Sequence, residues 1–239
     1  MKKGSSAQKR AKSDFFAALE TSVRIYGPAR DMCRYDGDSF EDSTYQPNVA
    51  AKVVGLAFLG AVAAWEDFLA EAYMGYLSGY AAPNGYAPEL ISGRAMNKSH
   101  ARLLAAGESN SGAAERKMRW NNFRWVQALS KIHFKAGHPF RLVDEADVKW
   151  LDLSVIIRNR IAHNSDQARR TFKNSVNRLF RLPENSPLPR GFSPGQLLIV
   201  FLDPYLELHQ LRNDDHFWGD IFEGYISLWR RLGDQICPG

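Results

Sequence analysis

The chain has 239 residues, of which 45% are hydrophobic and 24% are charged, and these are the proportions of an ordinary soluble globular protein. Its net charge is +5, and its two cysteines, Cys33 and Cys237, form no CxxC pair. The number and spacing of the cysteines argue against a disulfide framework or a zinc site. They predict that the protein is located in a reducing cytoplasm. The basic, polar N-terminus has no apolar run behind it, so no signal peptide is expected.

The most apolar segment, residues 53–65, is 13 residues long and contains no charged side chain. A helix that spans a bilayer needs roughly 20 apolar residues. We therefore expect a buried core helix here and no membrane partner.

Basic residues gather in two places along the chain. Residues 1–12 carry five basic side chains and no acid, and residues 169–190 carry six basic side chains against one acid. Such clusters suit a polyanionic partner such as RNA, because each neutralised phosphate releases counterions. A solvated basic face without a partner is the other interpretation.

Residues 1–11 predict a flexible basic tail, followed by one domain over residues 12–239. A helix is expected over residues 12–33, with Ser13 as its N-cap and a bend or end at Pro28. A loop then precedes a long helix, which is apolar nearly all round in its first half and amphipathic in its second. The loop covers residues 36–47, and the long helix covers residues 49–80.

The rest of the chain also predicts helices separated by glycine, proline and polar residues. The predicted helices cover residues 95–106, 115–135, 144–164, 165–180 and 214–236, with breaks at 81–88, 106–114, 136–142 and 182–194. Residues 195–204 are compatible with either a strand or a helix. With no repeats and few strand signals, the fold class is all-α, as a bundle-like domain.

The predicted helix over residues 144–164 ends in the sequence IRNRIAHN, which begins at residue 157. Positions four apart on a helix lie about 40° from each other, so Asn159 and His163 share a face. Arg158 lies roughly 140° from His163, but its long side chain can reach the same cleft.

These three residue types suit phosphodiester chemistry. Histidine can take or give a proton, arginine presents a charged fork to phosphate oxygens, and asparagine can hold a hydroxyl, a phosphate oxygen or the histidine ring. Cations near a helix C-terminus also stabilise the helix dipole, so the spacing alone fits a structural role as well.

The sequence RNRIAH, residues 158–163, resembles the R-x4-6-H motif of the HEPN superfamily, in which a polar residue, often Asn, follows the Arg. The upstream segment AWEDFL, residues 64–69, is similar to one in many stand-alone bacterial HEPN ribonucleases. The order of the predicted helices resembles that of the family over most of the chain. The specific motif covers only six to eight residues.

The resemblance implies a HEPN-like bundle that forms a homodimer, in which two copies of the motif build one composite active site. It implies a metal-independent endoribonuclease, in which the 2′-hydroxyl attacks the adjacent phosphate and leaves 2′,3′-cyclic phosphate and 5′-hydroxyl ends. His163 would act as the general acid and base, Arg158 would stabilise the scissile phosphate, and Asn159 would orient the substrate or the ring. No metal or cofactor is implied.

By the same resemblance, Glu66 on the earlier long helix would hold Arg158, with Asp67 as the neighbouring alternative. Glu66 could equally be a solvated acid on an amphipathic helix. Arg160, Arg169, Arg170 and Lys173 are the expected RNA-binding residues, although Arg160 could instead face water. The biological role by analogy is that of a toxin or phage-defence effector, restrained by an antitoxin or regulatory protein.

Two other functions remain open from the sequence. One is a non-catalytic module of the same fold that binds RNA, a nucleotide or a partner protein. The other is an unrelated helical interaction protein in which RNRIAH occurs by chance.

Overall fold

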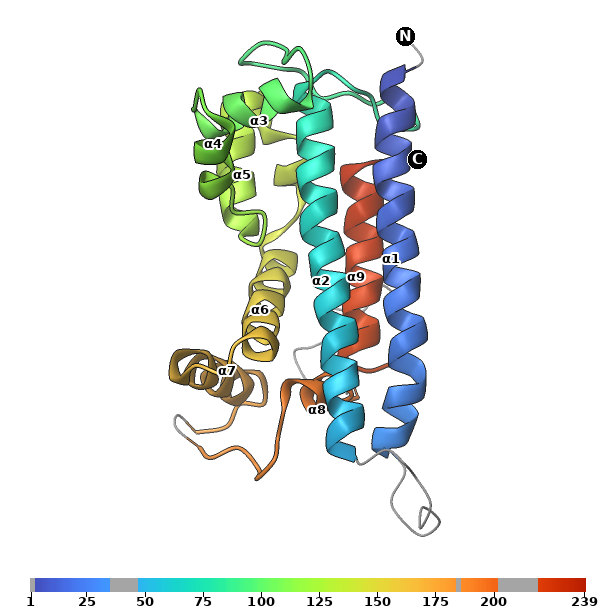
Figure 1. The fold of residues 1–239 in the computed structure, drawn as a ribbon, viewed down its shortest axis with the longest axis vertical. Coiled ribbons are helices and arrows are strands. Elements are labelled where there is room, and N and C mark those ends of the chain that lie inside the picture. Colours follow the sequence, from blue (N-terminus) through green and yellow to red (C-terminus); the bar gives the residue numbers. More distant parts are fainter. Residues whose placement is uncertain (1–2, 35–46, 184–185, 202–218) are drawn as a thin grey trace. The chain divides into compact units, whose positions relative to one another are not determined.

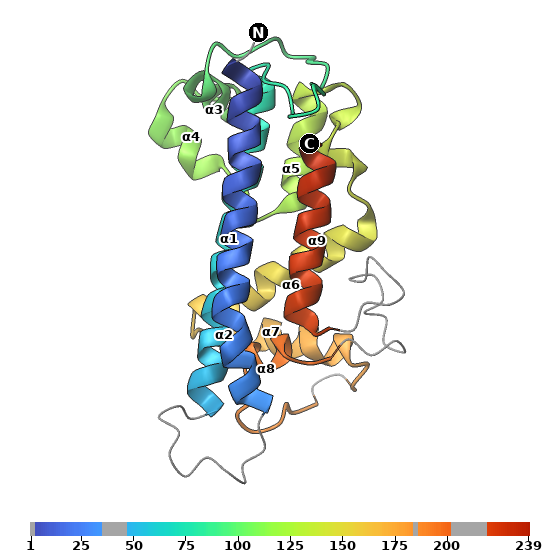
Figure 2. The same cartoon turned by 90° about the vertical axis from the view of Figure 1, so that its right-hand side faces the viewer.

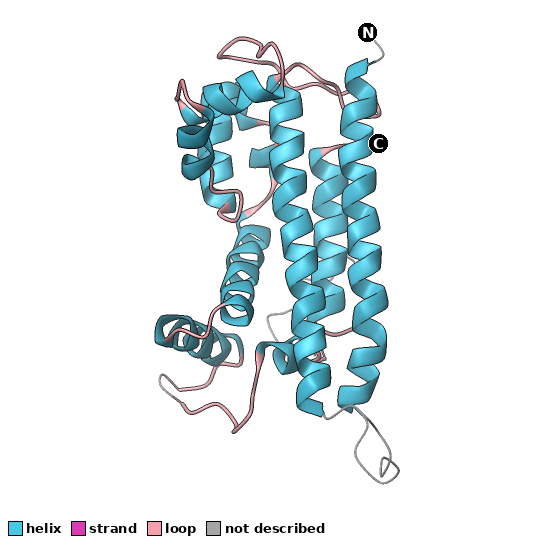
Figure 3. Cartoon of the chain, viewed as in Figure 1, coloured by secondary structure: helices cyan, strands magenta, loops and turns pink. Residues whose placement is uncertain are grey.

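The computed structural model describes residues 3–34, 47–183, 186–201 and 219–239. Regular structure in these ranges is helical apart from two isolated bridges, between Leu90 and Phe134 and between Phe201 and Asp220, so the all-α prediction is confirmed (Figure 3). The helices labelled in Figure 1 are α1 (Lys3–Arg34), α2 (Pro47–Leu77), α3 (Lys98–Ala106), α4 (Ser111–Lys117), α5 (Phe123–His133), α6 (Glu145–Ala162), α7 (Asp166–Leu179), α8 (Pro194–Leu198) and α9 (Ile221–Ile236). The short 3-10 helices η1 (Lys135–Gly137) and η2 (Phe140–Leu142) follow α5.

The chain divides into two compact units, and the divisions fall inside α1, α2, α6 and α9. The first unit contains Met1–Ala17, Ala64–Leu151 and Trp229–Gly239, and the second contains Ala18–Ala63 and Asp152–Leu228. The single domain over residues 12–239 stays a prediction.

The beginning of α1 differs from its prediction, because the helix starts at Lys3 and residues 3–11 are not a flexible tail. The buried side chain of Gln8 donates from Nε2 to the carbonyl oxygen of Ala72 at 3.0 Å. The thiol of Cys237 lies 3.8 Å from the carbonyl oxygen of Gln8. A polar residue thus anchors this segment to α2, and a polar anchor leaves no hydrophobic signal in the sequence.

The helix also continues past two predicted boundaries. Ser13 lies inside α1 and is not its N-cap, and Pro28 lies inside α1 and does not end it. A proline removes one backbone hydrogen bond of a helix. Packing compensates on both sides of Pro28, because Tyr26 and Ala29 are buried in the second unit.

The long apolar helix α2 has the expected core role. Among the described helices, residues Asn48–Leu77 alone have the length and composition to cross a membrane, and half of the apolar window is buried inside the protein. Phe58 and Val62 are buried in its first half, and Trp65 and Tyr73 in its second. The helix ends where Gly79 adopts a left-handed conformation with φ of 73°.

The core of the first unit is aromatic. Phe15 of α1 stacks on Phe68 of α2 with ring centroids 4.7 Å apart, and Trp65 contacts Phe123 of α5 at 6.1 Å. Tyr73 extends this cluster to the segment after α5, where Phe134 and Phe140 are buried. Asp147 of α6 receives two hydrogen bonds from Arg231 of α9, at 2.6 and 2.9 Å.

Two asparagine N-caps between α3 and α5 start helices at positions where the sequence predicted no helix start. Asn110 caps α4 within the expected loop at 106–114, and Asn122 caps α5 within the expected helix at 115–135. Each side-chain oxygen accepts backbone N–H groups at the start of a helix, so each starts a new helix. The predicted helix at 95–106 and the turn at 136–142 agree with α3, η1 and η2.

The core of the second unit joins α1, α2 and α9, which run side by side in Figures 1 and 2. Tyr26 stacks on Phe222 at 3.9 Å, and Phe58 contacts both Phe222 and Tyr225. The hydroxyl of Tyr26 donates to the buried carboxylate of Asp220, which also accepts from the Glu223 backbone at 3.1 Å at the start of α9.

The C-terminal elements largely follow their predictions. Helices α6 and α7 confirm the predicted pair at 144–164 and 165–180 within two residues. The ambiguous segment at 195–204 begins as helix α8, with Ser193 and Gln196 forming a capping box. Two parts of the predictions lie outside the described residues. They are positions 36–46 of the loop predicted at 36–47, and residues 202–218, which include the start of the helix predicted at 214–236.

Candidate functional site

Helix α6 carries the RNRIAH sequence to the surface of the second unit. Ile157 is fully buried, and a β-carbon added to Gly55 of α2 would lie 3.5 Å from Cγ1 of Ile161. These apolar residues fix the last turns of α6, while His163, just past the helix end, is exposed. The exposed imidazole meets the first requirement for reaction with a large substrate.

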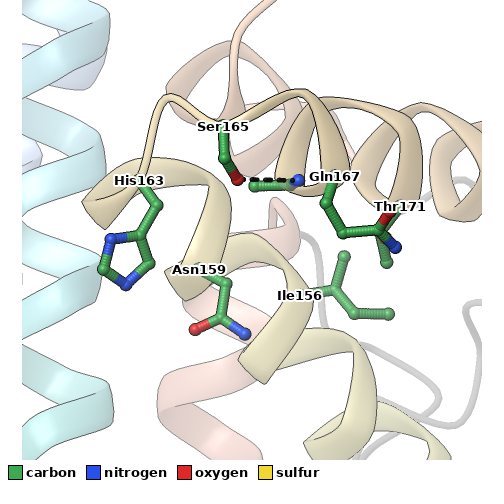
Figure 4. A pocket seen from close by; sticks show the side chains of 7 residues that line it. Ile156, Asn159, His163, Ser165, Gln167 and Thr171 are labelled. Atoms are coloured by element: carbon green, nitrogen blue, oxygen red, sulfur yellow. Dashed lines mark hydrogen bonds between the residues drawn. The ribbon is translucent and has the colours of Figure 1, made fainter.

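Asn159 and His163 line one open hollow of about 320 Å³. Its remaining lining residues are Ile156, Ser165, Gln167, Ala168 and Thr171. Figure 4 shows Asn159 between His163 and Ile156 on the α6 side, with Gln167 and Thr171 on the α7 side. All seven residues come from one continuous stretch of the second unit.

The shared face predicted for Asn159 and His163 is confirmed by this arrangement. The His163 backbone N–H donates to the carbonyl oxygen of Asn159 at 2.9 Å, so helical geometry extends to His163. The two side chains therefore sit one helical turn apart at the wall of the hollow.

Arg158 lies beside the hollow and is not one of its lining residues. Its Nη1 donates to the amide oxygen of Asn159 at 3.2 Å. This contact uses Oδ1 of Asn159 and leaves the Nδ2 group to donate hydrogen bonds. Asn159 is thus bonded to Arg158 through its side chain and to His163 through its backbone carbonyl oxygen.

Two of the predicted RNA-binding residues converge on Asn164 in the link between α6 and α7. Arg160 donates to its Oδ1 at 3.4 Å and Arg169 donates to the same atom at 3.2 Å. Arg169 also lies 3.6 Å from Asp166. Asn164 therefore orients two arginines in the link between α6 and α7.

The remaining basic residues belong to the outer surface of α7. Arg170 is exposed and Lys173 is half-buried. At about 100° per residue, Arg169, Arg170 and Lys173 fall on one side of the helix, and Gln167 and Thr171 fall on the neighbouring side. The basic side and the hollow are adjacent faces of the same element.

Helix α7 contributes site residues that were not predicted from the sequence. Ser165 caps α7 by accepting a hydrogen bond from the Ala168 N–H at 3.2 Å, as the dashed line in Figure 4 shows. Gln167 donates from Nε2 to the hydroxyl of Thr171 at 3.3 Å. The N-cap preference of Ser165 could have predicted that the first turn of α7 lies near the motif. It could not have predicted which face of α7 lines the hollow.

Glu66 is half-buried on α2 and belongs to the first unit, whereas Arg158 belongs to the second. Asp67 is exposed. The expected contact between Glu66 and Arg158 therefore stays a prediction.

Among the described residues, no three His, Cys, Asp or Glu side chains are grouped as metal ligands would be. Comparison of the chain with models of known protein families, with curated proteins and with solved structures gives no match.

Proposed function

We propose that the protein is an endoribonuclease that cleaves RNA without a metal ion and leaves 2′,3′-cyclic phosphate and 5′-hydroxyl ends. The observation that carries the proposal is the grouping of His163 and Asn159 at one open hollow, with Arg158 bonded to Asn159. A proton carrier, an amide and a permanent cation are the groups that such a transesterification uses. The HEPN-like motif supports the same assignment.

In the proposed reaction, a neutral imidazole takes the proton of the 2′-hydroxyl, whose oxygen attacks the adjacent phosphorus. The bond from phosphorus to the 5′-oxygen breaks, and a protonated imidazole gives its proton to that leaving oxygen. Each proton transfer is typically worth roughly 10²- to 10⁴-fold in rate. Two imidazoles in opposite protonation states would allow both transfers in one event.

The second imidazole would come from a second copy of the chain. We expect a homodimer in which two sets of Arg158, Asn159 and His163 face one RNA backbone. The exposure of His163 is compatible with such an approach. Light scattering should give twice the 27.0 kDa mass of the chain.

The charges around the hollow suit a polyanionic substrate. Arg160 and Arg169 are oriented by Asn164 at the link between the helices, and Arg170 lies exposed on α7. The N-terminus of α7 adds the positive end of a helix dipole. We assign these arginines, with Lys173, to binding phosphates on either side of the cut.

An RNase of this kind needs a restraint in the cell. We therefore place the protein in the cytoplasm as a toxin or phage-defence effector, controlled by an antitoxin or a triggering signal. Expression of the wild-type chain should slow growth, and His163→Ala should relieve the effect.

The direct test is incubation of the purified protein with total RNA in the presence of a chelator. We expect new ends that carry cyclic phosphate, and a loss of cleavage of at least a hundredfold in His163→Ala and in Arg158→Ala. His138→Ala is the matched control, because His138 is an exposed histidine in the first unit. Cleavage that survives His163→Ala would refute the assignment.

One observation favours a second function, a non-catalytic RNA-binding module. Arg158 bonds to Asn159 and is not among the residues that line the hollow. Such a module would bind RNA with a strong salt dependence and would produce no new ends. The same assay, combined with a binding titration, separates the two functions.

A further inference from the structure

We propose that the hollow beside His163 holds one unpaired adenine of the RNA next to the cut, and that Gln167 and Thr171 select it. This inference rests on the proposed function, and it names the substrate preference of the same site. The residues that carry it lie on α7, outside the RNRIAH motif.

The size and shape of the hollow suit a single nucleotide. Its volume of about 320 Å³ is at the lower end of the range for small-molecule sites. Ile156 on α6 and Ala168 on α7 supply apolar contacts for the face of a base. Sequence-specific RNA recognition uses bases that have left the helical stack, so we expect the target to be single-stranded.

The polar groups of the hollow are already oriented by hydrogen bonds. Gln167 donates one Nε2 hydrogen to Oγ1 of Thr171 at 3.3 Å. This bond leaves Oε1 of Gln167 as an acceptor, its second Nε2 hydrogen as a donor, and the Thr171 hydroxyl as a further donor. An oriented amide that can both donate and accept is equipped to read the edge of a base.

Adenine is the base that a glutamine amide recognises best with two hydrogen bonds. The amide oxygen accepts from the exocyclic N6, and the amide N–H donates to N7. The bond to Thr171 fixes the plane of the Gln167 amide, so the pairing starts from an oriented group.

The position of the pocket relative to the reacting groups places the selected base near the cut. Figure 4 shows Gln167 and Thr171 at one end of the hollow and His163 at the other, with Asn159 between them. Asn159 keeps its Nδ2 group for the substrate, because Arg158 bonds to its Oδ1. A nucleotide that spans the hollow would bring its phosphate towards the imidazole.

The test begins with the cleavage sites in an RNA pool of randomised sequence. We expect adenine to be enriched at one fixed position beside the cut in the wild type. In Gln167→Ala and in Thr171→Val the enrichment should fall by about tenfold. Asn174→Ala is the matched control, since Asn174 is exposed on α7 outside the hollow.

A binding measurement separates a failure of this inference from a failure of the proposed function. In the His163→Ala background, short oligoadenylate should bind more tightly than oligouridylate, and Gln167→Ala should remove the difference. A wild type that cleaves without base preference overturns the adenine pocket alone. A wild type that never cleaves overturns the ribonuclease, and equal binding of the two oligonucleotides then overturns the pocket as well.

Discussion

The guanidinium of Arg158 donates a hydrogen bond to the amide oxygen of the adjacent residue, Asn159, at 3.2 Å. Neighbouring residues on a helix point in directions about 100° apart, so this contact requires the arginine to fold back along the helix surface. It sets the orientation of an amide that lines the hollow. The arginine therefore influences the hollow even from outside it.

We predict that Arg158 and Asn159 act as a coupled pair in RNA cleavage. The double variant Arg158→Ala with Asn159→Ala should lose less activity than the sum of the two single losses, by about 1 kcal/mol or more. The measurement is a double-mutant cycle on kcat/KM. Additive losses would show that the contact has no role in the reaction.

His163→Ala should change the free energy of unfolding by less than about 1 kcal/mol, because the side chain is exposed. Urea denaturation of the wild type and the variant measures the difference. This measurement is also a control for the activity assay, because a variant that unfolds would lose cleavage whatever the catalytic role of His163. A large loss of stability would assign His163 a structural role instead.

The stability of the protein should depend on pH through His133. Its ring is buried in the first unit, with Nδ1 at 2.7 Å from the hydroxyl oxygen of Ser92, and burial lowers its pKa below the ordinary value of 6.5. Below about pH 6.5 the unfolded chain binds a proton that the folded protein excludes. The free energy of unfolding should therefore have its full value above about pH 6.5 and should decrease as the pH falls below that value.

His133→Gln should reduce this dependence on pH, whatever its effect on stability at neutral pH. Urea titrations between pH 5 and 7.5 would reveal it as a smaller slope. If wild type and variant show the same slope, other groups control the acid sensitivity.

Gly195→Ala should destabilise the fold strongly. A β-carbon at this position would lie 1.8 Å from the carbonyl oxygen of Ala51, which is backbone and cannot rotate away. We expect a loss of about 3 kcal/mol, at the upper end for overpacking. Thermal unfolding monitored by circular dichroism is the measurement.

Gly60→Ala is the matched control for this substitution. Its added β-carbon would meet only the Ser22 hydroxyl oxygen at 3.5 Å, an ordinary contact, and the position is exposed on α2. The higher helix propensity of alanine should stabilise this variant by about 0.5–1 kcal/mol. Equal effects of the two substitutions would show that the contact between α8 and α2 is not tight in solution.

Local rules predicted much of the fold from the sequence. The long apolar sequence of α2 and the acids at the start of α6 predicted those two helices. The failures have tertiary causes. Gln8 holds the start of α1 through one buried hydrogen bond, and the packing of Tyr26 and Ala29 carries the helix through Pro28.

The candidate site was predictable on one helix only. The four-residue spacing of Asn159 and His163 follows from helix geometry, and both residues line the hollow. The contribution of Gln167 and Thr171 depends on the direction in which α7 leaves the link at Asn164. No periodicity within a single element encodes that direction.

The seven residues that line the hollow fall within residues 156–171, a single uninterrupted segment of the chain. The buried Phe172 and Val176 secure α7 from the opposite direction. Ligand preference can accordingly drift through substitutions at 167, 168 and 171 while the scaffold stays intact. A library randomised at those three codons would turn this segment into a readily engineered recognition element.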